Sequence, residues 1–128
     1  MIYLDSSVVL ADLFTERRNV SDSFWREDLV SSRLLEYEVW NRIHFRGLAR
    51  PKGERAKVLI NQIDLIEMTP AILTRALEPF SIALRTLDSL HVASLEYLRV
   101  KDRSIVLASY DKRMVAVAVS LNIPLYEF

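Results

Sequence analysis

Short apolar runs alternate with helical segments along this 128-residue chain. The two clearest runs are Met1–Leu4 and SIVLA at 104–108, which are continuous rather than alternating with polar residues. Strands of this kind are buried on both faces, as in parallel sheets that helices cover on either side. Their alternation with helices predicts βαβ units. We therefore predict an α/β fold with a mostly parallel central sheet.

Turn and capping residues predict the other elements. A serine pair, Ser6-Ser7, should cap a first helix. Pro70 should begin a helix that Pro79 interrupts, and Thr86 should cap a helix that runs to about Val100. Helices are further expected at 19–27, 33–49 (stopped by the Arg-Pro at 50–51), 53–64 and from Asp111, with strands at 29–31, 65–68 and 123–126.

Composition excludes several classes of chemistry. The chain has no cysteine, two glycines and two histidines. It therefore has no disulfide, no thiolate metal site and none of the usual glycine-rich phosphate loops. Basic and acidic residues are equal at 17 each, and no apolar stretch is long enough to span a membrane. We expect one domain over 1–128, no secretory signal and a cytoplasmic location.

Three aspartates lie where strands end or helices begin. Ligands of open parallel sheets bind beyond the carboxyl ends of the strands, and Asp5 follows the first strand directly. Asp88 falls in the first turn of an expected helix, and Asp111 follows the SIVLA strand. Each has an ordinary alternative role, because acids at these positions also cap helices and complement the helix dipole.

Glu38 is harder to explain as a surface residue. At about 100° per residue, it lies about 20° from Phe45 and about 40° from Leu34 on the helical wheel, within an apolar stripe. A buried carboxylate needs a partner, a proton or a metal ion. Arg42, one turn later, is the candidate partner. If the four acids converge, their repulsion requires a cation, and oxygen-only ligands select Mg²⁺ or Mn²⁺.

Four segments together resemble the acidic motifs of the PIN-domain ribonucleases, most closely the VapC toxins of toxin–antitoxin pairs. They are YLDSS (3–7), SSRLLEYEVWNR (31–42), RTLDSLHVAS (85–94) and LASYDKRM (107–114). The resemblance covers nearly the whole chain in the right order. It assigns the catalytic, metal-binding acids to Asp5, Glu38, Asp88 and Asp111, and the supporting hydroxyls to Ser6 and Ser109.

The resemblance also implies a fold and an activity. The fold is a three-layer α/β/α arrangement with a sheet of four or five strands. The activity is Mg²⁺- or Mn²⁺-dependent endonucleolytic cleavage of RNA. The implied partners are an RNA substrate, a second copy of the chain in a homodimer, and a cognate antitoxin protein.

Two further features have competing interpretations. The stretch at 42–57 holds six basic residues and one acid, which suits RNA phosphates or a solvated helical tip. His91 lies one turn after Asp88 and could orient that acid, but a packed, hydrogen-bonded histidine is favoured. The candidate RNA contacts are Arg42, Arg46, Arg50, Lys52 and Arg55.

Two rival functions remain. A catalytically silent RNA- or protein-binding module on the same fold would keep the basic stretch but lose acids, whereas all four are present here. A phosphoacceptor receiver domain requires two adjacent acids after the first strand and a lysine after the last. This chain has Asp5-Ser6 and ends in PLYEF, so the receiver class is disfavoured.

Overall fold

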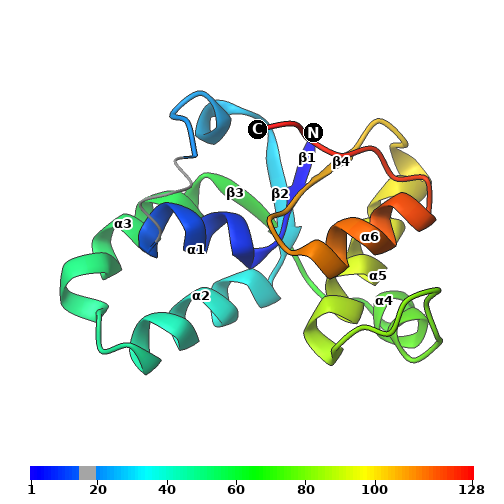
Figure 1. Cartoon of the computed structure of the whole chain (residues 1–128), viewed down its shortest axis with the longest axis horizontal. Helices are drawn as coiled ribbons and strands as arrows, with labels where there is room; N and C mark the ends of the chain where they lie inside the picture. Colours follow the sequence, from blue (N-terminus) through cyan, green and yellow to red (C-terminus); the bar gives the residue numbers. More distant parts are fainter. Residues whose placement is uncertain (15–19) are drawn as a thin grey trace.

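The computed structural model of the protein describes residues 1–14 and 20–128 (Figure 1). In these residues a four-stranded sheet has the order β3-β2-β1-β4, and every pair is parallel. The predicted parallel sheet is therefore confirmed. The strands are β1 (Ile2–Leu4), β2 (Leu29–Ser32), β3 (Ile63–Ile66) and β4 (Val106–Ala108).

Helices cover both faces of the sheet and make three layers (Figure 1). Residues alternate across β1: Ile2 and Leu4 pack on one side, while Tyr3 packs on the other. This follows from the period of two in a strand. The first face is covered by α1 (Ser6–Phe14), α2 (Leu34–Phe45) and α3 (Ala49–Asn61), and the second by α4 (Pro70–Ala76), α5 (Thr86–Lys101) and α6 (Lys112–Ser120).

The predicted single helix over 33–49 is wrong, because α2 ends at Phe45. Gly47 has a positive φ of 66°, which glycine adopts without steric cost. Its N–H donates to the carbonyl of His44, and the N–H of Leu48 donates to that of Ile43, which is a Schellman end. Pro51 does not stop a helix but lies in the first turn of α3, where no N–H is needed.

Other boundaries also differ from expectation. In place of a helix over 19–27 there is a short 3-10 turn, Phe24–Arg26, and Asn19 lies outside the described residues. The strand expected at 65–68 lies two residues earlier, and the one at 123–126 is reduced to a single parallel bridge between Leu107 and Leu125. Thr86 is the first residue of α5 and does not cap it.

The strand order places a ligand-binding position between β1 and β4. The chain runs from β1 through β2 to β3 on one side, then crosses the opposite face to reach β4 on the other side of β1. Where the order reverses, the loops beyond two neighbouring strands separate and leave a crevice. No helix in the described part of the chain is long and apolar enough to cross a membrane.

Candidate active site

A cavity of about 530 Å³ lies beyond the carboxyl ends of β1 and β4. All four predicted acids line it, although they come from four different places in the fold. Asp5 follows β1, Glu38 lies on α2, Asp88 on α5, and Asp111 precedes α6. The other polar residues that line the cavity are Ser6, Ser7, Arg42, Arg85, Thr86 and His91.

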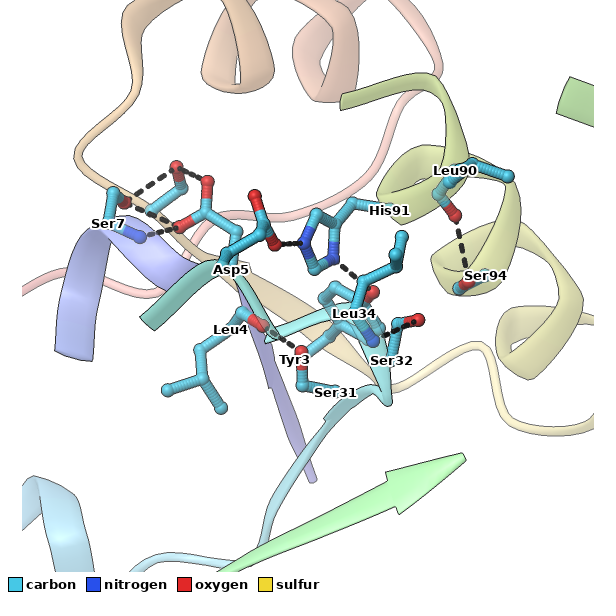
Figure 2. A network of polar contacts seen from close by, with 12 residues as sticks. Tyr3, Leu4, Asp5, Ser7, Ser31, Ser32, Leu34, Leu90, His91 and Ser94 are labelled. Carbon is cyan, nitrogen blue, oxygen red and sulfur yellow. Dashed lines mark hydrogen bonds and ion pairs between the residues drawn. The ribbon is translucent and has the colours of Figure 1, made fainter. Parts of the chain in front are cut away.

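Asp5 is the most buried of the four acids, with 4% of its surface exposed. Burial raises the pKa of this carboxyl to about 6, although hydrogen bonds from Ser7 and Ser109 oppose the increase. Ser7 donates to Oδ1 from both its backbone N–H at 3.2 Å and its hydroxyl at 2.5 Å. The Ser109 hydroxyl donates to Oδ2 at 2.8 Å. Both oxygens are therefore held in place (Figure 2).

After β1, the hydroxyl that donates to Asp5 belongs to Ser7. The family resemblance assigns the supporting hydroxyl at this end of β1 to Ser6. The Ser7 hydroxyl also accepts the N–H of Tyr110 at 2.9 Å, so it ties the ends of β1 and β4 together. Ser109 accepts the N–H of Asp111 at 3.0 Å and thereby completes the connection. Ser6 lines the cavity. An aspartate commonly accepts from the residue two positions on, and this signal could have identified Ser7.

Glu38 is at the edge of the buried face of α2 and not at its centre. The buried residues are Leu35, Val39 and Ile43, whereas Phe45 is 85% exposed, so the expected stripe was rotated too far toward Phe45. The Glu38 side chain is 16% exposed, and its Oε1 lies 2.5 Å from Nε2 of His91. The partner of Glu38 is thus His91, from another helix, and not Arg42.

His91 is packed and hydrogen-bonded, as the sequence favoured, but it contacts Glu38 and not Asp88. It is 1% exposed, and its Nδ1 lies 2.7 Å from the hydroxyl of Tyr3. Burial by itself lowers the pKa of His91, but the hydrogen bond and negative charge of Glu38 outweigh burial and raise it. Glu38 and His91 are 53 residues apart in the chain, so sequence reasoning could not identify this contact.

Asp88 and Asp111 occupy helix starts, as expected. Burial raises the pKa of Asp88, and the nearby charge of Asp111 raises it further. Asp111 caps α6, and its Oδ1 accepts the N–H groups of Arg113 at 2.8 Å and Met114 at 3.2 Å. Capping thus explains the position of Asp111 while leaving it on the cavity wall.

The donor set fits a hard cation by its chemistry, since four carboxylates line one cavity and burial raises the pKa of two of them. In the residues that the structure describes, no group of three or more carboxylate or imidazole side chains is placed to hold a metal ion. One oxygen of Glu38 and both of Asp5 are already hydrogen-bonded within the protein.

The structure divides the basic stretch into parts with different environments. Arg42 lines the cavity, whereas the Arg46 guanidinium lies over the Phe14 ring, 4.8 Å from its centroid. Arg55 forms an ion pair with Asp12 at 3.2 Å. Arg50 and Lys52 lie in the first turn of α3. Arg85, which sequence reasoning did not single out, joins Arg42 on the cavity wall.

This protein has a cavity at the point where the strand order of a parallel sheet reverses. One acid from each of four segments lines that cavity. The chain belongs to the PIN domain family, whose pattern matches residues 2–120. It is similar to Ribonuclease VapC46 of Mycobacterium tuberculosis, with 33% identity over 127 residues that cover 94% of this chain and 92% of that protein. It is also similar to Ribonuclease VapC47 of the same species, with 26% identity over 123 residues that cover 91% and 88%.

Proposed function

We propose that the protein is a divalent-metal-dependent endoribonuclease and the toxin of a toxin–antitoxin pair. The observation that carries this proposal is the convergence of Asp5, Glu38, Asp88 and Asp111 on one cavity. Both relatives are named ribonucleases and are similar to this chain over most of their length, which supports RNA as the substrate.

In this mechanism the four acids hold one or two Mg²⁺ or Mn²⁺ ions, directly or through water. A bound divalent ion supplies a water of lowered pKa and stabilises the charge that develops at the phosphate. Ser7 and Ser109 keep the Asp5 carboxylate oriented by their hydrogen bonds. Ser6 lines the cavity, and in this mechanism its hydroxyl contacts the scissile phosphate.

Two arginines provide the positive charge that an RNA backbone requires. Arg42 comes from α2 and Arg85 from the residue before α5, and both line the cavity. In the described residues, no hydrogen bond or ion pair engages either guanidinium, so both can bind phosphate bidentately. Arg46, Arg50 and Lys52 extend this charge toward the tip of the α2–α3 pair, whereas Arg55 is held by Asp12.

The proposed partners follow the toxin assignment. The chain acts in the cytoplasm as a homodimer, and a cognate antitoxin protein blocks the cavity. Sedimentation of the purified chain measures its oligomeric state, and co-expression with a candidate antitoxin tests for an inhibitor. A catalytically silent binding module is the alternative, and it predicts RNA binding without cleavage.

The test of the proposal is the Asp5→Asn variant, assayed for RNA cleavage with Mg²⁺ or Mn²⁺. The substitution preserves size but removes one ligand charge, so cleavage should fall by at least the roughly 10- to 100-fold that losing an outer partner of a metal ligand costs. Asp64→Asn, an exposed acid on β3, is the matched control and should cleave normally. Equal cleavage by the Asp5→Asn and wild-type proteins contradicts the assignment.

A further inference from the structure

A chain of hydrogen bonds runs through the protein interior behind the cavity. The Tyr3 hydroxyl lies 2.7 Å from Nδ1 of His91, and Nε2 of the same ring lies 2.5 Å from Oε1 of Glu38. Tyr3 is fully buried and His91 is 1% exposed, whereas the Glu38 side chain is 16% exposed, so this chain of hydrogen bonds meets the cavity at Glu38. Figure 2 shows the His91 ring with Tyr3 on one side and the polar cluster around Asp5 on the other.

The three residues come from three elements, one of which also carries another of the proposed ion-binding acids while a second directly precedes one. Tyr3 lies on β1, two residues before Asp5, and His91 lies on α5, three residues after Asp88. Glu38 comes from α2 on the opposite face of the sheet. The hydrogen bonds therefore fix the position of Glu38 relative to the elements that present the other acids.

The direction of each hydrogen bond follows from the inventory of donors. A carboxylate that carries no proton only accepts, and toward such a carboxylate Nε2 of His91 donates the hydrogen of the bond with Glu38. Burial keeps the Tyr3 hydroxyl protonated because it raises its pKa. That hydroxyl donates to Nδ1 of the neutral ring and accepts from the charged ring. In either state the Tyr3 contact leaves Nε2–H directed at Glu38.

We propose that His91, held by Tyr3, is a positioning residue that fixes the Glu38 carboxylate at the cavity wall for ion binding. The inference rests on the proposed function, in which Glu38 is one of the acids that hold the ion. Without His91, Glu38 loses the hydrogen bond at its Oε1 and is free to rotate about its side-chain torsions. Partners of metal-binding carboxylates and imidazoles commonly act in this way.

The experiment measures Mn²⁺ binding by calorimetry to the full-length chain without RNA, alongside RNA cleavage at saturating Mn²⁺. His91→Leu should weaken Mn²⁺ affinity by about 10- to 100-fold, the usual effect of losing such a partner. His91→Gln, whose amide N–H can replace Nε2–H, should recover part of this loss. Tyr3→Phe, which removes only the hydroxyl, should show a smaller loss than His91→Leu.

Matched controls distinguish positioning from folding. His44→Gln makes the same substitution at an exposed histidine on α2 and should leave Mn²⁺ affinity unchanged. Circular dichroism reports whether each variant folds, and if His91→Leu does not, His91→Gln and Tyr3→Phe carry the test. Nitrogen-15 spectra of the imidazole should show a proton on Nε2 of His91 in the wild-type protein.

The outcomes separate the two proposals. Wild-type protein that binds no Mn²⁺ overturns the proposed function and this inference with it. Wild-type protein that binds Mn²⁺, together with folded His91→Leu or Tyr3→Phe variants of equal affinity, overturns the inference alone. A bare Nε2 facing Glu38 in the spectra also overturns it, because a bare nitrogen cannot donate to a carboxylate.

Discussion

At the residue scale, Asp5 shows how a buried acid can oppose stability. Its carboxyl is buried beside other acids, and two serine hydroxyls, one backbone N–H and the nearby charge of His91 compensate for part of the lost water. An ordinary structural role would not require a buried charge here, because an asparagine could make similar hydrogen bonds. The cost is understandable if a cation normally neutralises the site.

A pH-dependent stability difference between wild type and Asp5→Asn follows from this burial. The pKa of Asp5 is raised from 3.8 to about 6 on folding. The folded protein therefore binds the proton more tightly, and the stabilising contribution of the protonated form is lost as pH rises through about 6. In EDTA at pH 8, Asp5→Asn should be more stable than wild type by about 2 to 3 kcal/mol, from about 1.4 kcal/mol per pKa unit.

Urea denaturation of both proteins between pH 4 and pH 8 measures this difference. The gap in unfolding free energy should shrink toward pH 4, where the wild-type carboxyl is protonated in the folded state and partly protonated in the unfolded state. Other titrating groups are common to the two proteins and cancel to first order. A gap that is independent of pH would show that Asp5 has an ordinary pKa in the folded protein.

At the scale of elements, the turn between α2 and α3 determines where the basic residues lie. The Schellman end at Gly47 stops α2 two turns after Glu38 and starts a second helix at Ala49. A single continuous helix over 33–49 would have carried Arg46 and Arg50 further from the sheet. The observed turn instead lets α3 return along α1, where Arg55 meets Asp12.

The two glycines provide a matched pair for testing this turn. Gly47→Ala should destabilise the protein by about 1 kcal/mol, because a Cβ disfavours a positive φ. Gly53→Ala lies within α3, where a new Cβ would sit 3.4 Å from the Trp40 ring, and should stabilise by about 0.5 kcal/mol through helix propensity. Thermal or urea unfolding measures both. The same sign for the two variants would contradict this account.

At the scale of the whole molecule, the three layers bring two cationic side chains to a cavity of carboxylates. Arg42 reaches the cavity from one helical layer and Arg85 from the other. His91 engages the carboxylate that Arg42 might have paired with, and no ion pair to another described residue engages the Arg42 guanidinium. In the proposed function, the acids hold a cation and the two arginines bind the phosphates.

The salt dependence of RNA binding tests this division. Log affinity falls as log salt rises, and the slope of this line is negative. With Ca²⁺ in place of the catalytic ion, Arg42→Gln and Arg85→Gln should each make the slope less negative by about 0.7, as expected for the loss of one phosphate contact with single-stranded RNA. Arg55→Gln is the matched control, because Asp12 already engages its guanidinium. Equal slopes for wild type and all three variants would move the RNA away from this cavity.

The sequence by itself determined the fold class and the acids that line the cavity. Continuous apolar segments such as Met1–Leu4 predict a parallel sheet, because strands of such a sheet are buried on both faces. An acid that directly follows such a strand lies at the carboxyl edge of the sheet. The positions of Asp5 and Asp111 were predictable because they depend only on neighbours in the chain.

Only the tertiary structure decided which partners these acids have. Glu38 had a local candidate in Arg42, yet its hydrogen bond is with His91, because β1, α2 and α5 pack so that the imidazole reaches across. The Ser7 hydroxyl, which donates to Asp5, also accepts the N–H of Tyr110, 103 residues away in the chain. Such contacts depend on how distant elements pack, and no periodicity or spacing within a single segment encodes them.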